Sequence, residues 1–335
     1  MTDYLLLLLG FALLVAGGEL LVRGAAGTAE RLGMSPLLIG LTLVGFGTSM
    51  PELVTSVQAS LSGSPGIAVG NIVGSNIANI LLILGVSTLI MPLAVKRKAL
   101  VRDGGLVLVT AALFVGVGFF LPLDRLVGTV FLLGLAGYLY YAYSQEKADA
   151  PLGHTAAFEK VEAHDEVLAA GAGRTAAEAG GDRSGAVAVI LPLAMALVGL
   201  AVIVAGGKLL VDAASAIARG AGISETVIGL TVVAVGTSLP ELVTSVVAAL
   251  RRHGDVALGN VLGSNIYNIL GIGGVTALIA PTTIPAEIAR FDNPVMLGVS
   301  LLLLIVAYTG RRIARIEGAF MLAAYGLYLF AVWPV

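Results

Sequence analysis

The sequence has no cysteine and little charge. Only 12% of its 335 residues are Asp, Glu, Lys or Arg, whereas 58% are hydrophobic. The lack of cysteine excludes disulfides and thiolate metal sites. A soluble domain carries about twice this charged fraction, so an ordinary soluble protein is also excluded. The net charge of −2 indicates no particular partner, and we expect no nucleic-acid partner.

Apolar runs recur along the whole chain. Each has roughly twenty residues and is long enough to cross the hydrocarbon core as a helix. Only Asp3 precedes the first run, without the basic region and cleavage site of a removable signal peptide, so we expect this run to stay as a helix. The runs predict an all-α polytopic protein of the cell membrane with ten transmembrane helices, at residues 4–22, 36–61, 66–91, 104–121, 126–143, 186–210, 226–250, 256–280, 293–309 and 316–333.

One long polar stretch interrupts this pattern, at about residues 144–184. It is rich in Ala, Gly and charge, and about forty such residues cannot bury a core of their own. We interpret it as a flexible linker with a short surface helix near residues 156–170. It separates a first unit, residues 1–143, from a second, residues 185–335. An acidic calcium-sensing module is an alternative, although the stretch shows no regularly spaced ligands.

The two units are repeats of one another. Residues 40–85 align with 229–274 without a gap, at an offset of 189, and 28 of these 46 positions are identical. Because each unit has five predicted helices, the second must enter the membrane in the opposite orientation. Inverted repeats characterise many secondary transporters, whose substrate sites lie between the repeats near the membrane midplane.

The basic residues test the orientation independently. With the N-terminus outside, 15 of the 19 Lys and Arg fall on the cytoplasmic side and four fall outside. The positive-inside rule therefore predicts that both termini are extracellular and that the 144–184 linker is cytoplasmic. The 15 are Arg23, Arg31, Lys96, Arg97, Lys98, Arg102, Lys147, Lys160, Arg174, Arg183, Arg251, Arg252, Arg311, Arg312 and Arg315; the four are Arg125, Lys208, Arg219 and Arg290.

Two carboxylates interrupt long apolar runs. Glu52 lies in "GTSMPEL" and Glu241 lies in "GTSLPEL", at equivalent places of the two repeats. A lone buried carboxylate costs several kcal/mol unless it is protonated, paired or bound to a cation. No Lys or Arg occurs in the helices of the repeat cores, so we expect a cation from solution to be the partner. The alternative is a pair of permanently protonated glutamates that serve helix packing.

The residues around each glutamate can supply further oxygens. Pro51 and Pro240 cannot donate to the helical ladder, so each frees the carbonyl four residues earlier and favours a broken helix. Free carbonyls at membrane depth are tolerated where they line a cavity. Hydroxyls lie one turn before each glutamate, on Thr48, Ser49, Thr237 and Ser238. Their alternative role is hydrogen bonding to a carbonyl of their own helix.

The next predicted helix of each repeat carries polar side chains on one face. It reads "GNIVGSNIANI" from Gly70 and "GNVLGSNIYNI" from Gly259. The glycines form G-x-x-x-G steps that allow close helix approach. Four-residue spacing places Ser75 with Asn79, and Ser264 with Asn268, on one face. Oxygen-only ligands without nearby His or Cys suit hard cations such as calcium and sodium.

These duplicated blocks resemble the two alpha-repeats of the sodium/calcium exchanger family, within the cation/calcium antiporter superfamily. The resemblance implies an antiporter that exchanges calcium for sodium by alternating access, with the first and sixth helices sliding against the other eight. It implies a cation site built from the carboxylates of Glu52 and Glu241, the side chains of Thr48, Ser49, Ser75, Asn79, Thr237, Ser238, Ser264 and Asn268, and the carbonyls of Gly45 and Ala234.

One position departs from part of the family. Some relatives, notably the potassium-dependent branch, carry aspartate where this sequence has Asn268. The neutral amide favours potassium-independent exchange. More than two sodium ions per calcium would make the exchange electrogenic.

Three other functions compete with sodium-driven exchange. They are a proton-coupled antiporter on the same scaffold, a passive cation channel, and an intramembrane hydrolase that uses the paired carboxylates. Inverted repeats favour a transporter over a channel. The hydrolase lacks His metal-ligand spacing and a Ser/Lys or Ser/His arrangement. We therefore expect no enzyme activity, no cofactor and no obligate protein partner; the expected partners are calcium, sodium and the lipid bilayer.

Overall fold

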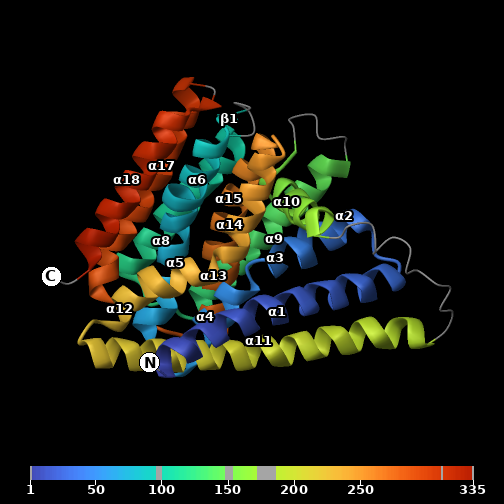
Figure 1. The fold of residues 1–335 in the computed structure, drawn as a ribbon, viewed down its shortest axis with the longest axis horizontal. Helices are drawn as coiled ribbons and strands as arrows, with labels where there is room; N and C mark the ends of the chain where they lie inside the picture. The colour runs from blue at the N-terminus through green and yellow to red at the C-terminus, as the bar shows by residue number, and fades with distance from the viewer. Residues whose placement is uncertain (1, 96–99, 148–153, 172–185, 311, 334–335) are drawn as a thin grey trace.

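The computed structural model describes residues 2–95, 100–147, 154–171, 186–310 and 312–333 (Figure 1). The protein is mainly helical, with a single two-stranded sheet among the described residues. Eight helices in this part of the chain are long and apolar enough to cross a membrane, and a bent pair gives a ninth when taken as one span. The membrane protein predicted from sequence is therefore confirmed in its class. Linker residues 148–153 and 172–184 lie outside the described residues, as do Lys96, Arg97, Lys98, Arg174, Arg183 and Arg311.

The first unit begins with a long helix, α1, and continues through several broken helices. The elements are α1 (Thr2–Arg31), α2 (Pro36–Ile39), the π-helical segment η1 (Gly40–Val44), α3 (Gly45–Gly47), α4 (Met50–Leu61), α5 (Pro65–Ala78), η2 (Asn79–Ile83), α6 (Leu84–Ile90), β1 (Leu93–Ala94), η3 (Leu100–Gly104), α8 (Gly105–Phe120) and α9 (Arg125–Lys147).

The second unit follows the same order of helical elements, but its strand lies before the last helix instead of after the counterpart of α6. It contains α11 (Ala186–Ala221), α12 (Glu225–Ile228), η4 (Gly229–Val233), α13 (Ala234–Thr237), α14 (Leu239–Leu250), α15 (Gly254–Ile266), η5 (Tyr267–Gly273), α16 (Gly274–Ile279), η6 (Ile288–Asp292), α17 (Asn293–Gly310), β2 (Arg312–Ile313) and α18 (Arg315–Val332). Between the units lies α10 (Ala156–Gly171).

The helices that carry the two glutamates are broken, as their prolines predict. A bend of 47° at Ser238 separates the segment Glu225–Thr237, which ends with α13, from α14. The equivalent α3 and α4 are separated at Thr48 and Ser49. Pro51 and Pro240 lie in the first turn of α4 and α14, where a missing N–H costs nothing because no carbonyl precedes it in the helix. The predicted crossing at 36–61 is thus assembled from pieces that are individually too short to span a bilayer.

Helices α1 and α11 lie side by side along one edge of the molecule (Figure 1). Glycines allow this close contact: a Cβ at Gly17 would lie 2.6 Å from the backbone nitrogen of Ile203, and one at Gly10 would lie 2.8 Å from the Cβ of Leu210. These are the first and sixth helices of the sequence prediction. Their pairing makes them one layer that packs against the α4-containing core.

Helix α10 corrects the sequence interpretation of the linker. A helix was predicted near residues 156–170 and is present, but it is not on the surface. Ala156, Ala157, Lys160 and Ala163 are all fully buried, and α10 packs against α15 and α14 (Figure 1). Helix α10 forms no core of its own, as its composition indicates, but it packs into a core made by the membrane helices.

The loops gather on two sides of the helical layer. On one side, Leu93 and Ala94 of β1 pair with Ile313 and Arg312 of β2, and β1 also contacts the start of α15. On the other side, Leu123 and Thr282 form a β-bridge. Loops that the basic residues assign to one side of the membrane therefore lie together.

Candidate cation-binding site

The two glutamates are buried and are held by reciprocal hydrogen bonds. Glu52 and Glu241 are each 1% exposed. Ser238 Oγ donates to Glu52 Oε1 at 2.9 Å, and Ser49 Oγ donates to Glu241 Oε1 at 3.1 Å. Each carboxylate is thus contacted by the serine at the helix break of the other unit. The structure thus brings these four predicted side chains together.

Two asparagines hold the glutamate-bearing helices in place. Asn71 Nδ2 donates to the backbone carbonyl of Glu52 at 3.1 Å, and Asn260 Nδ2 donates to that of Glu241 at 3.1 Å. Because these bonds go to backbone atoms, the asparagines brace α4 and α14 and leave the carboxylate oxygens available.

Hydrogen bonds connect α5 and α13 in one half of the site. Ser75 Oγ donates to the carbonyl of Ala234 at 3.4 Å, and Thr237 Oγ1 lies 2.9 Å from Asn71 Oδ1. Thr237 also lies 3.3 Å from the Ala234 carbonyl. The structure thus brings Ser75, Thr237 and the predicted Ala234 carbonyl together between α5 and α13.

The equivalent half is organised differently. Thr48 Oγ1 and Asn260 Oδ1 correspond to the bonded Thr237 and Asn71, yet both are buried without a hydrogen-bond partner among the described residues. Gly45, the counterpart of Ala234, is buried at the start of α3. Ser264, the counterpart of Ser75, is 2.5 Å from the ammonium of Lys160.

Lys160 corrects the expectation that no basic side chain reaches the carboxylates. Its Nζ lies 3.3 Å from Glu241 Oε1 and 6.0 Å from the centroid of the Tyr267 ring, and the residue is 0% exposed. Burial lowers the pKa of this ammonium, whereas the carboxylates of Glu241 and Glu52 favour its charged form. The repeat cores contain no basic residue, as the sequence shows, but the linker supplies one through α10.

The two predicted asparagine ligands also differ. Asn79 Nδ2 donates to Asn265 Oδ1 at 2.9 Å. Asn268 Oδ1 and Asn76 Oδ1, the equivalent pair of positions, are both buried without a partner in the described part of the chain. Asn265 of α15 is therefore linked to Asn79, one of the predicted ligands, at the start of η2.

Several buried oxygens of the site make no hydrogen bond to the described residues. Both glutamates keep one such atom, Oε2, and the others belong to Thr48, Asn79 and Asn268. Unsatisfied buried oxygens are costly and call for a partner such as a cation. No cluster of three or more His, Cys, Asp or Glu exists among the described residues, so neutral oxygens must supply most of any coordination shell. This donor set suits a hard cation.

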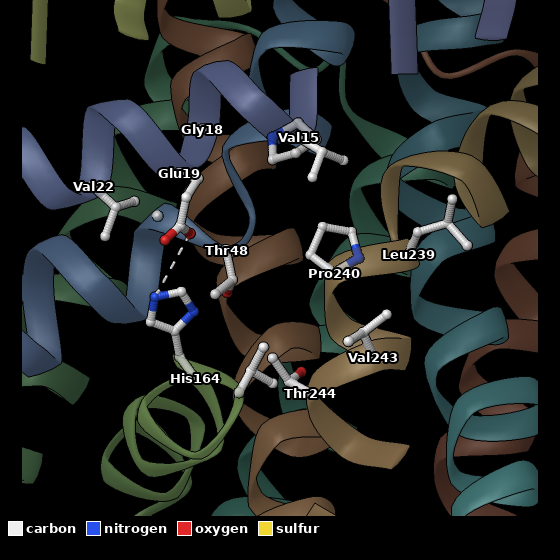
Figure 2. Close-up of a pocket in the computed structure, with 13 residues that line it drawn as sticks. Val15, Gly18, Glu19, Val22, Thr48, His164, Leu239, Pro240, Val243 and Thr244 are labelled. Carbon is white, nitrogen blue, oxygen red and sulfur yellow. Dashed lines mark ion pairs between the residues drawn. The ribbon is translucent and has the colours of Figure 1, made fainter. Parts of the chain in front are cut away.

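A cavity of about 340 Å³ reaches this region from α1. Figure 2 shows Thr48 and Thr244 facing it, with Glu19 of α1 above and His164 of α10 below. Glu19 Oε2 lies 4.0 Å from His164 Nε2, and Glu19 also forms an ion pair with Arg23, four residues later in α1. The cavity is mainly apolar, and α10 forms part of its wall.

Comparison with known proteins places this arrangement in context. The family model of the sodium/calcium exchanger protein matches residues 2–144 and 191–333. The chain is similar to the sodium/calcium exchanger MaX1 of Methanosarcina acetivorans, with 38% identity over 99% of both chains. It is also similar to the putative antiporter CaxA of Alkalimonas amylolytica, with 36% identity over 95% of this chain and 94% of the relative.

A solved structure shows the same likeness. The sodium-calcium exchanger NCX_Mj, soaked with 100 mM Na+ and 10 mM Sr2+, superposes with a TM-score of 0.60 and 31% identity, covering 99% of both chains. Residues 145–190, which include α10, lie between the two parts that the family model matches. The segment that reaches Glu241 thus lies outside the two stretches that the family model matches.

Proposed function

Because the chain belongs to the sodium/calcium exchanger protein family, we propose that it exchanges calcium for sodium by alternating access between two inverted five-helix repeats. The observation that carries this proposal is the reciprocal contact of Ser49 with Glu241 and of Ser238 with Glu52. It puts two carboxylates between equivalent elements of the two units. Substrate sites of inverted-repeat transporters lie at such an interface.

The proposed cation site consists of the twelve residues inferred from sequence. Glu52 and Glu241 supply charge, and the hydroxyls, amides and carbonyls around them supply neutral oxygens. The unpartnered oxygens of Thr48, Asn79 and Asn268 support their assignment. The reaction moves ions without making or breaking covalent bonds, so it requires neither an enzyme activity nor a cofactor.

Charge balance supports electrogenic, potassium-independent exchange. One calcium neutralises the two glutamates, and the neutral oxygens of both units can hold additional sodium ions. Asn268 adds no third negative charge. More than two sodium ions per calcium would therefore move net charge in each cycle.

Flux into proteoliposomes tests the proposal. We expect an outward sodium gradient to drive calcium uptake, with a rate that depends on membrane voltage and not on potassium. A proton gradient in place of sodium should drive no uptake. Uptake driven by protons alone would establish the proton-coupled alternative, and voltage-insensitive or strictly potassium-dependent uptake would contradict the charge balance.

The proposed orientation has both termini extracellular and the linker cytoplasmic. The chain has no native cysteine, so single cysteines report accessibility directly. Asp165 is an exposed position of α10, whereas Ala157 is fully buried. We therefore expect an impermeant thiol reagent to label Thr2→Cys on intact cells and Asp165→Cys only after permeabilisation. The opposite pattern would reverse the topology.

A further inference from the structure

Helix α10 takes a place that the internal repeat assigns to another element. Against α5, a Cβ at Gly74 would lie 2.8 Å from the Cβ of Ala234 and would also clash with the carbonyl oxygen of Leu230. At the equivalent Gly263 of α15, the nearest atoms are instead the Ala156 carbonyl oxygen, at 2.9 Å, and Lys160 Cβ, at 3.3 Å. One turn of α10 thus occupies the position that η4 and α13 occupy in the other half.

The contact between α10 and the glycine step of α15 is complementary in shape. Ala156, Lys160 and Ala163 are spaced four and three residues apart, so they share one face of α10. Gly259 and Gly263 form a groove for this face; a Cβ at Gly259 would clash with Glu159. Helix α10 also contacts η1 and α3, the counterparts of η4 and α13. It therefore lies between these elements and α15.

The start of α10 is received by buried polar groups. Asp103 Oδ2 accepts a hydrogen bond from the backbone N–H of Ala156 at 3.1 Å, and Tyr138 Oη accepts one from Ala157 at 3.1 Å. Glu146 Oε1 accepts from the N–H of Thr155 at 2.7 Å. The first N–H groups of a helix have no internal partner, and negative charge there is stabilising. The docked position of α10 is therefore specified by side chains of η3 and α9.

The charged end of Lys160 contacts two of the proposed cation ligands. Its ammonium is 3.3 Å from Glu241 Oε1 and 2.5 Å from Ser264 Oγ. Calcium needs its oxygen ligands at about 2.3–2.6 Å, and a cation bound by these two side chains would collide with the ammonium. The bound cation and the Lys160 ammonium would also compete for the negative charge of the Glu241 carboxylate.

From these contacts we propose that α10 is a built-in inhibitor that docks in the ion pathway and places the Lys160 ammonium where the transported cation binds. The inference rests on the proposed function of the site. Ion binding at Glu241 and docking of α10 then exclude one another, so the linker must withdraw before the second unit can close. Any condition that weakens docking therefore raises exchange. The apparent affinity for calcium equals the intrinsic affinity multiplied by the fraction of molecules in which α10 is undocked.

Neutral substitution of Lys160 gives the first test. Lys160→Ala and Lys160→Gln should lower the KM for calcium uptake and tighten calcium binding measured by calorimetry, by about tenfold if α10 is docked nine-tenths of the time. Lys147→Ala, at an exposed position at the end of α9, is the matched control and should leave both values unchanged. Monodisperse elution in detergent establishes that each variant is folded.

The outcomes separate the inhibitor from the proposed function. Wild-type sodium-driven exchange with the same KM and calcium affinity in both Lys160 variants overturns the inhibitor alone. Loss of exchange by both folded variants also overturns it, since Lys160 would then belong to the transport machinery. If neither the wild type nor any variant exchanges calcium for sodium, the proposed function fails. The inhibitor then stands only if Lys160→Ala binds calcium more tightly than the wild type does.

A tether tests docking while keeping Lys160. Glu166 of α10 bonds His253 at the corner before α15, so the two cysteines of Glu166→Cys/His253→Cys can be bridged by a short bis-methanethiosulfonate reagent. The reagent forms one reducible disulfide with each cysteine and releases methanesulfinate. We expect bridging to lower exchange at least tenfold and reduction to restore it. Each single variant treated with the reagent should keep its rate. Undiminished exchange by the bridged protein would overturn the proposal.

Discussion

The two halves of the proposed cation site have nearly the same sequence and different packing. Around Gly70 and Gly74, α5 packs directly on the second unit, and Thr237 is bonded to Asn71. Around the equivalent Gly259 and Gly263, α10 is the neighbour, and Thr48 and Asn260 are left with unpartnered oxygens. Repeated sequence therefore specifies a surface that can be closed in two ways, by the other unit or by the linker.

The same asymmetry extends to a buried aspartate outside the site. Asp103 accepts a hydrogen bond from Ala156 of α10, whereas Asp292, 189 residues later, is bonded by Tyr328 Oη at 2.9 Å. Asp292 thus bonds a side chain of α18. Asp103 bonds both Tyr138 of α9 and the first turn of the linker helix α10. The difference shows where the chain has adapted a repeated feature to α10.

The largest expected effect separates the two glutamates. Glu52→Gln and Glu241→Gln should each abolish sodium-driven calcium uptake, because each removes one of two charged ligands. Only Glu241→Gln leaves a buried lysine without its anion, a change that costs about 3–5 kcal/mol when the contact cannot open. We therefore expect Glu241→Gln to lower the melting temperature in detergent or to release α10, and Glu52→Gln to do neither.

A double variant provides the control for that difference. In Glu241→Gln/Lys160→Met both charges are gone, so thermal stability should return toward wild type while uptake stays absent. Full transport by either single glutamine variant would contradict the site assignment. If Glu52→Gln and Glu241→Gln have equal melting temperatures and equal protease resistance of α10, the two glutamates do not differ in their contact with the linker helix.

The glycine steps give the next effect. Gly74→Ala introduces a Cβ against the backbone of η4, and overpacking of this kind destabilises a protein by about 1–3 kcal/mol. Gly263→Ala meets only α10, which can move away. Thermal unfolding should therefore detect Gly74→Ala, whereas limited proteolysis of the linker should detect Gly263→Ala. Similar unfolding temperatures with an intact linker in both variants would show that the two steps are equivalent.

Much of this comparison could be predicted from the sequence, because it depends on local rules. Proline predicted the helix breaks before Glu52 and Glu241. Four-residue spacing predicted that Ser75 shares a helical face with Asn79, and Ser264 with Asn268. The glycine steps predicted close helix contacts. Hydrophobic length predicted the class of protein, although it could not show that residues 36–61 divide into short elements.

The role of Lys160 could not be predicted in the same way, because it depends on a contact between segments about a hundred residues apart. Composition assigned the linker to solvent, and composition does not report what a short helix can dock against. One local signal existed: Ala156, Lys160 and Ala163 form a small-residue face interrupted by one charge. Such a face fits a glycine groove that ends in a carboxylate.

A smaller effect is expected at the two asparagines. Asn79 uses its amide nitrogen to bond Asn265, so Asn79→Asp loses the donor and places a carboxylate against a carbonyl oxygen. Asn268→Asp disturbs no side-chain bond among the described residues and adds charge. A charged ligand contributes about 1 kcal/mol more than a neutral one, so we expect Asn268→Asp to stay folded and to change calcium affinity about fivefold. Asn79→Asp should lose stability as well.

Reversal-potential measurements in proteoliposomes test the effect of Asn79→Asp and Asn268→Asp on ion coupling. The added charge of Asn268→Asp should alter ion preference or coupling, seen as a shifted reversal potential at fixed gradients. Unchanged affinity and reversal potential would exclude Asn268 from the site. Equal stability of the two aspartate variants would show that the Asn79–Asn265 bond has no structural role.

The smallest effect concerns pH and the corner where α10 meets the second unit. The hydrogen bond and charge of Glu166 raise the pKa of His253, and Glu162 of α10 and Asp255 of α15 add to this. Arg251 and Arg252 lie on the same turn as His253, which is 53% exposed. A raised pKa means that the contact stabilises docking while His253 is protonated, and that this contribution is lost as pH rises through the raised pKa.

Docking of α10 should therefore weaken, and calcium uptake should rise, between about pH 6 and pH 8. Because His253 is half exposed, solvent screens the interaction, and we expect a change of only about twofold to threefold. Initial rates of calcium uptake at fixed sodium and calcium gradients measure this change.

His253→Gln cannot gain a proton, so its residual pH dependence reports all other titrating groups and should be flatter than that of wild type. If α10 inhibits by docking, Lys160→Ala should flatten the profile as well, since undocking then gives no further gain. A wild-type rate that falls over this range after subtraction of the His253→Gln profile would show that the corner contact does not hold the inhibitor in place.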